Sequence, residues 1–209
     1  MWDFIRPVNL IRYLVIWRAT GSLVHLPRCL SRALSHDIGT MIADRLPTQQ
    51  ARAWHKTLSS QLPCWPIEAV LFAYPGKRTY GQGEVILWEL KLLANSADHG
   101  LFLELLLPAM EEAASTSDPR WHRPRGLWGH FEIQAVYTAR GAHWEPVVSD
   151  GRLDVRYRAS PTQWAEGLTF GLDIDRRYRR LTWVTPVDLG EGNQEAPTLQ
   201  GILDGLMDR

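Results

Sequence analysis

Three side chains in the first 60 residues have the chemistry needed to cleave RNA without a metal ion. His36 falls on a predicted helix, and His55 with Lys56 falls on the next one. One imidazole would take the 2′-hydroxyl proton, the other would protonate the leaving 5′-oxygen, and the ammonium would stabilise the phosphorane. Each histidine taken alone has the ordinary alternative of a surface or structural residue. The sequence thus gives His36, His55 and Lys56 as a candidate catalytic set.

A second group of side chains is suited to holding RNA. The stretch from residue 120 to 130 combines arginines, tryptophans and two glycines in one loop, and its candidate contacts are Arg120, Trp121, Arg123, Arg125 and Trp128. Guanidinium and indole planes stack on unpaired bases, and glycines let the backbone approach a phosphate. The alternative is a solvated loop whose tryptophans cap the core.

The charge is distributed in segments, although the chain is neutral as a whole. Its cations are 20 Arg and only 3 Lys, and Arg is the residue of bidentate phosphate contact. Residues 1–60 carry a net charge of +5 and residues 119–180 one of +4, while residues 61–118 carry −5 and residues 181–209 carry −4. A coding sequence rich in G and C would also favour Arg. If the two basic segments share a face, that face binds a polyanion.

Several classes of protein lose support from the motifs that this sequence lacks. The histidines and the two cysteines, Cys29 and Cys64, have no metal-ligand spacing, so no metal site is predicted. No phosphate-binding glycine loop and no nucleophile elbow occur, so no small-molecule cofactor is expected. Two thiols, no apolar run of membrane-spanning length and no signal peptide favour a cytoplasmic protein without a membrane partner.

The hydrophobic periodicity predicts an α+β protein. Strands are expected at residues 10–20, 67–74, 84–93 and 131–138, and helices at 27–46, 49–62 and 100–114. This order is the βαββαβ arrangement of a ferredoxin-like fold, which is also the scaffold of the RNA-recognition motif. A hairpin is predicted from 144–148 and 153–157, followed by a strand at 180–187 and a helix at 198–207. We therefore expect a first ferredoxin-like domain at 1–140 and an incomplete second unit at 141–209.

Five stretches together resemble one known family. They are the Leu-Pro entry into the helix that carries His36 (residues 26–36), the short helix carrying His55 (51–56), a strand and helix (83–93 and 98–110), a glycine-rich entry into a strand (125–133), and a later strand (181–189). This layout resembles the CRISPR-associated RAMP superfamily, most of all its repeat-RNA-processing endoribonucleases. The resemblance covers most of the chain, and each motif is short.

The resemblance implies a function and also a departure from it. It implies a protein of antiviral defence that cleaves precursor CRISPR RNA without a metal, leaves a 2′,3′-cyclic phosphate and stays in a ribonucleoprotein complex with other CRISPR-associated effector subunits. His55 then matches the position of the family's catalytic histidine. However, the family's second unit normally has a glycine-rich loop that grips RNA, and no such loop follows Pro186. The alternatives are a non-catalytic RAMP subunit that caps one end of a guide-RNA complex, or a ferredoxin-like protein that binds no nucleic acid.

Overall fold

The computed structural model describes residues 8–26, 30–49, 51–52, 67–74, 77–115 and 131–167. All of these belong to one unit of the chain, Met1–Phe170, whereas the second unit, Gly171–Arg209, lies outside the described residues. The strand predicted at 180–187 and the helix predicted at 198–207 fall in that second unit, so they stay predictions.

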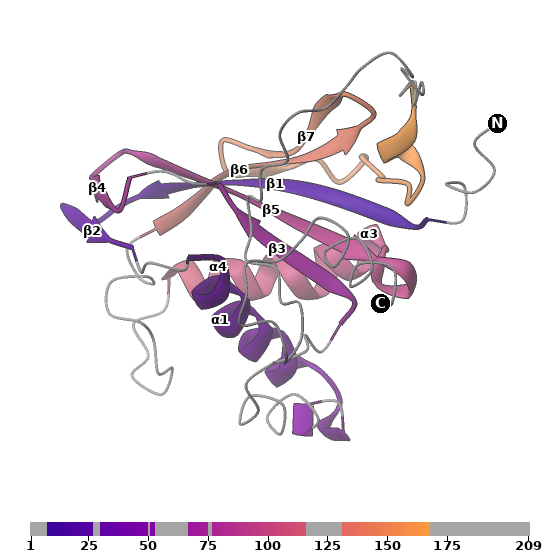
Figure 1. The fold of residues 1–209 in the computed structure, drawn as a ribbon, viewed down its shortest axis with the longest axis horizontal. Helices are drawn as coiled ribbons and strands as arrows, with labels where there is room; N and C mark the ends of the chain where they lie inside the picture. The colour runs from indigo at the N-terminus through magenta and orange to yellow at the C-terminus, as the bar shows by residue number, and fades with distance from the viewer. Residues whose placement is uncertain are drawn as a thin grey trace, which may run out of the picture. The chain divides into compact units, whose positions relative to one another are not determined.

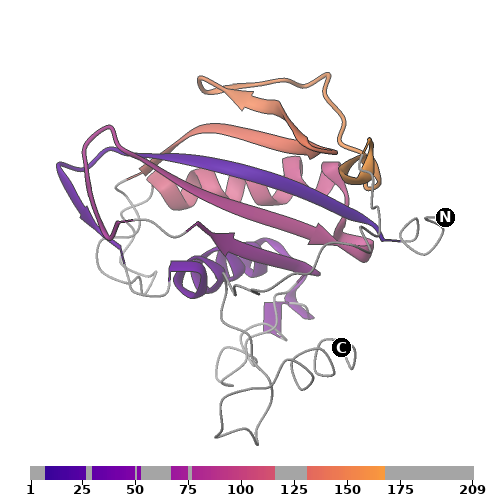
Figure 2. The ribbon, with the colours of Figure 1, turned by 45° about the horizontal axis from the view of Figure 1, so that its top comes forward.

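The centre of the described unit is a six-stranded sheet in which every neighbouring pair is antiparallel (Figures 1 and 2). Its strands, in spatial order, are β3 (Ala69–Ala73), β5 (Val85–Leu93), β1 (Leu10–Ala19), β6 (Phe131–Arg140), β7 (His143–Ser149) and β8 (Arg152–Leu153). The predicted strands at 10–20, 67–74, 84–93 and 131–138 are confirmed to within two residues. In β1 and over most of β5, buried and more exposed residues alternate, which suits a strand with one buried face, whereas the short β3 is apolar throughout.

Two helical segments cover one face of this sheet (Figure 1). The first is α1 (Leu30–Arg45), and the second is continuous through α3 (His99–Leu101), the π-helical segment η2 (Phe102–Leu106) and α4 (Leu107–Ser115). The second one starts where the Asp98 carboxylate accepts a hydrogen bond of 2.8 Å from the Gly100 backbone nitrogen. Both helices were expected from their periodicity.

The core lies between these helices and the sheet. Alternate residues of β1, namely Ile11, Tyr13, Val15 and Trp17, point into it and are almost completely buried. Helix α1, which was predicted at 27–46, contributes Leu34, Ile38 and Ile42, which are spaced four residues apart and are fully buried. The other residues of β1 lie on the opposite face of the sheet.

Two local features differ from the sequence prediction. A short ribbon of β2 (Leu23–His25) and β4 (Thr79–Gly81) was not expected (Figure 1). The predicted hairpin is present and turns at Asp150-Gly151, but its second strand, β8, ends at Leu153 and not at Tyr157. The reason is that the Asp154 side chain accepts from the Arg156 backbone nitrogen at 2.9 Å, and this bond turns the chain.

The α+β class is therefore confirmed, with an antiparallel sheet and few helices. Strand β7 begins after residue 140, the end of the predicted first domain, and pairs with β6 in the same sheet. The predicted partial second unit at 141–209 extends beyond the described residues, so that division of the chain stays a prediction. Within the described ranges, no helix combines the length and the apolar character that a membrane crossing requires.

Candidate functional site

The residues singled out in the sequence fall almost entirely outside the described part of the chain. His36 lies on α1, but its side chain is not among the described ones. The rest of the candidate catalytic set and the whole candidate RNA-binding loop lie outside the described residues: His55, Lys56, Arg120, Trp121, Arg123, Arg125 and Trp128. Their roles stay predictions, and so does the proximity of His36 to His55.

The sheet has a second face, opposite the helices, that the sequence analysis did not consider. We call it the outer face. It follows from the strand register, since residues paired across strands point to the same side. Its main members are Arg12, Leu14, Ile16 and Arg18 of β1, Val85, Leu87, Glu89 and Lys91 of β5, Val70 and Phe72 of β3 with Tyr74 after it, Glu132 and Tyr137 of β6, and Trp144 of β7.

Cations and aromatic rings are interleaved on the outer face. Arg12 is paired with Lys91 across β1 and β5, and its guanidinium carbon lies 5.2 Å from the ring centre of Trp144. At the β3 side, the rings of Phe72 and Tyr74 meet edge to face, with their centres 4.9 Å apart. The outer face thus combines a guanidinium above an indole with a pair of packed aromatic rings.

A buried carboxylate at the middle of the outer face holds two of these side chains in place. Glu89 is only 3% exposed, and its two oxygens accept from Arg12 Nε at 2.6 Å and from the Tyr74 hydroxyl at 3.1 Å. Burial, and then the negative charge of Glu89, raise the pKa of Tyr74, which keeps its hydroxyl protonated as a donor. Glu89 thereby fixes the direction of the guanidinium and of the phenol ring.

The charge on this face is unequally compensated. Arg12 is paired with Glu89, and Arg18 with Glu132. Lys91 makes no ion pair with any residue in the described ranges. Among its described residues, the outer face therefore carries at Lys91 a positive charge that has no ion-pair partner.

A polar cluster lies on the helix-covered side of the sheet, below β6 and β7. The Tyr157 hydroxyl donates to Glu145 at 2.7 Å and accepts from Gln163 Nε2 at 2.9 Å. Arg140 Nε donates to Glu145 at 2.8 Å. These two donors lower the pKa of Glu145, so the carboxylate stays charged. The cluster ties the segment around Gln163 to the end of the sheet.

His99, the first residue of α3, is also buried on this side. Its Nδ1 lies 2.8 Å from the Tyr13 hydroxyl, and its ring is stacked on that of Phe102. Burial, and then the positive charge of Arg158, lower the pKa of His99, while the Tyr157 backbone and Asp98 oppose the shift. The ring is therefore neutral at physiological pH.

Sequence reasoning missed the outer face, the polar cluster and the surroundings of His99. Arg12 and Arg18 were visible as the polar positions of an alternating strand, but Trp144 and Tyr74 join them only through strand pairing. Among the described residues, no cluster of three or more His, Cys, Asp or Glu side chains is arranged to hold a metal ion. No protein-family model, no curated protein and no solved structure matches this chain. Its function is therefore inferred from its own residues.

Proposed function

We propose that this protein binds RNA and that the outer face of its sheet is part of the binding surface. The observation that carries the proposal is the interleaving of cations with aromatic rings on one sheet face, from Lys91 through Arg12 to Trp144. Single-stranded RNA is bound in this way in general, with bases stacked on aromatic side chains and phosphates held by Arg and Lys. Tyr74 is 41% exposed, so its ring is accessible to a base.

The finer fold assignment is part of this proposal. We infer a ferredoxin-like βαββαβ unit formed by β1, α1, β3, β5, the α3–α4 helix and β6. The spatial order β3-β5-β1-β6 with both helices on one face supports it, since this is the arrangement in which an RNA-recognition motif leaves its other face free.

We propose further that the chain is a RAMP-type CRISPR-associated protein that works in the cytoplasm with CRISPR RNA and other effector subunits. The sequence resemblance supports this step. In the catalytic version, His55 and His36 transfer protons and Lys56 stabilises the phosphorane as the repeat RNA is cleaved. In the alternative version, the protein binds one end of the guide RNA and cleaves nothing.

RNA binding by the outer face is tested with three variants and a fluorescently labelled single-stranded RNA. Tyr74→Leu should weaken binding by about 1–3 kcal/mol, because a stacking ring is lost. Tyr74→Phe is the matched control: it removes the hydroxyl that donates to Glu89 but keeps the ring, so the affinity should be unchanged. Lys91→Gln should reduce the salt dependence by about one released counterion. Equal affinities for wild type, Tyr74→Leu and Lys91→Gln would disprove this role of the outer face.

The two versions of the CRISPR proposal are separated by incubating the purified chain with repeat RNA and a chelator. The catalytic version predicts a product ending in a cyclic phosphate, no cleavage when the scissile nucleotide is a deoxyribonucleotide, and a rate lowered about 10²–10⁴-fold in His55→Ala. Tight binding of the repeat RNA without any cleavage would support the capping subunit. A chain that binds no RNA at any salt concentration would refute both versions.

A further inference from the structure

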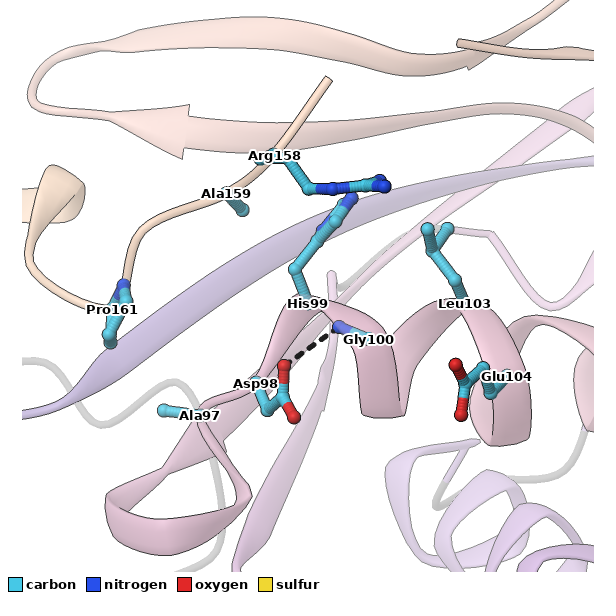
Figure 3. Close-up of a pocket in the computed structure, with 9 residues that line it drawn as sticks. All are labelled: Ala97, Asp98, His99, Gly100, Leu103, Glu104, Arg158, Ala159 and Pro161. Carbon is cyan, nitrogen blue, oxygen red and sulfur yellow. Dashed lines mark hydrogen bonds between the residues drawn. The ribbon is translucent and has the colours of Figure 1, made fainter. Parts of the chain in front are cut away.

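A cavity of about 570 Å³ opens between the start of the α3–α4 helix and the segment that follows β8 (Figure 3). Its polar lining consists of Asp98, His99, Glu104 and Arg158, and its apolar lining of Ala97, Leu103, Ala159 and Pro161. This volume is within the usual range for a small-molecule pocket, and such pockets combine apolar walls with a few polar groups. The polar groups therefore decide what the cavity can bind.

The first of these groups is the buried imidazole of His99, which is 4% exposed. Its Nδ1 lies 2.8 Å from the Tyr13 hydroxyl, and its Nε2 has no partner in good hydrogen-bond geometry among the described residues, although the Tyr157 backbone is close enough to raise the pKa of the ring. If Tyr13 donates to Nδ1, the proton of the neutral ring sits on Nε2. The other tautomer would leave both the Tyr13 hydroxyl proton and the Nε2 lone pair unsatisfied, at a greater cost. The Nε2–H group thus lacks a well-formed hydrogen bond, and an acceptor in the cavity would compete only with the Tyr157 backbone.

Arg158 supplies further donors beside it. Figure 3 shows the guanidinium of Arg158 next to the tip of the His99 ring. Its Nη1 makes long bonds of 3.3 Å to the carbonyls of Val155 and Tyr157. Nε and Nη2 donate to none of the described residues. The cavity wall formed by Arg158 and His99 therefore offers several N–H donors, and neither of these side chains offers an acceptor.

The helix side of the cavity offers hydrogen-bond acceptors instead of donors. The carboxylates of Asp98 and Glu104 lie there, away from the His99 ring (Figure 3). Asp98 Oδ1 accepts from the Gly100 nitrogen, whereas Glu104 accepts from none of the described residues. Two carboxylates would repel a simple anion such as phosphate. The ligand must therefore present acceptors on one edge and donors on another.

We propose that this cavity binds an unpaired guanine base, with O6 and N7 toward Arg158 and His99 and with N1–H and the 2-amino group toward the carboxylates. Guanine carries two neighbouring acceptors on one edge and two neighbouring donors on another, and Arg is the usual partner of O6 and N7. Adenine and uracil alternate donors with acceptors, so each leaves a polar group of the cavity unpaired. This inference extends the proposed RNA binding and rests on it for the source of the base.

The probes are GMP, inosine monophosphate, AMP and inorganic phosphate, each titrated into the full chain. The readouts are calorimetry and the ¹⁵N-edited spectrum of the histidine rings. GMP should bind about ten- to a hundredfold more tightly than AMP, and phosphate should not bind measurably. The His99 Nε2–H resonance should shift with GMP. Arg158→Gln should weaken GMP binding about tenfold or more. Arg156→Gln should not, because this exposed arginine, two residues earlier in the chain, does not line the cavity.

Inosine monophosphate lacks the 2-amino group and tests the carboxylate side. It should bind more weakly than GMP to the wild type, and this difference should disappear in Glu104→Leu, because that side chain has no acceptor for the 2-amino group. Equal binding of GMP and AMP, or an unmoved His99 resonance at saturating GMP, would overturn the guanine site.

An all-uridine RNA tests the outer face separately: if it binds while GMP does not, the cavity proposal fails and the proposed RNA binding stands. A uridine RNA with one guanine that gains affinity over all-uridine RNA identifies RNA as the source of the base, and no gain identifies a free nucleotide.

Discussion

Among the glycines whose surroundings are described, Gly141 is the one where an added methyl group should damage the fold most directly. It connects β6 to β7 with a left-handed φ of +54°, and its backbone nitrogen donates to the Gln163 carbonyl at 2.9 Å. A Cβ atom placed on this glycine would lie 1.8 Å from the Glu166 carbonyl oxygen. The colliding group is backbone and not a flexible side chain. In Gly141→Ala, the segment of η3 (Gln163–Ala165) must therefore move away from the sheet.

The cost of this movement follows from the bonds that the segment makes. The left-handed conformation costs an alanine about 1–2 kcal/mol. The Gln163 side chain is fully buried, and its Nε2 donates to the Ala139 carbonyl at 2.9 Å and to the Tyr157 hydroxyl at 2.9 Å. Losing these bonds adds about 1–3 kcal/mol, because buried groups are left unpaired. We expect Gly141→Ala to lower the free energy of unfolding by about 2–5 kcal/mol.

Gly151→Ala is the matched control. This glycine also has a left-handed φ, +71°, but nothing lies within 4 Å of the Cβ position. Only the conformational cost of about 1–2 kcal/mol should appear. Urea unfolding of the two variants, followed by circular dichroism, measures the difference. Equal losses in the two variants would refute the close approach of Glu166 to Gly141, and with it the attachment of the 163–166 segment to the sheet.

Three further predictions concern charge. RNA affinity should fall steeply and linearly with the logarithm of the salt concentration, since phosphates are neutralised by Arg and Lys, and a titration that is flat between low and moderate salt would contradict this. Arg12→Ala should lower the free energy of unfolding by about 3 kcal/mol, because it leaves the charge of Glu89 buried without its cation. Arg18→Ala should lower it by less than about 1 kcal/mol, since both side chains of the Arg18–Glu132 pair are 47% exposed. The folded chain disfavours protonation of His99, so the stability that neutral His99 contributes is complete above the unfolded pKa of about 6.5 and is lost as the pH falls below that value. Melting temperatures measured between about pH 7.5 and 5 should show this loss in the wild type and a smaller loss in His99→Gln.

The sequence predicted the elements that depend on local periodicity. β1 alternates so regularly, and α1 repeats its apolar residues so evenly, that their burial follows from one-dimensional spacing. The outer face could not be obtained in this way. Arg12 meets Trp144 only because β1 and β7 both flank β6, in a register that pairs Tyr13 with Thr138 and Ala139 with Trp144. No local rule in the sequence gives this register.

The cavity was missed for a related reason. His99 was one of seven scattered histidines in the sequence, without any neighbour that marked it as functional. What distinguishes it is its bond to Tyr13, a residue 86 positions away, and the closeness of Arg158 from the other end of the sheet. The start of the helix at Asp98 was visible from its capping residue, but which side chains would meet it depended on the whole sheet being formed.

The role of Trp121 and Trp128 in the predicted loop of residues 120–130 can be tested by comparison with Trp88, a tryptophan of the described core. Trp88 is fully buried in the core, where its ring meets that of Trp17 edge to face with centres 5.1 Å apart. Trp88→Ala should therefore lower the melting temperature strongly, at a cost of about 3–5 kcal/mol. If Trp121 and Trp128 stack on bases instead, Trp121→Ala and Trp128→Ala should leave the melting temperature unchanged and weaken RNA binding by about 1–3 kcal/mol each. Variants that melt as early as Trp88→Ala, with the folded fraction still binding RNA as tightly as the wild type, would show that these tryptophans cap the core.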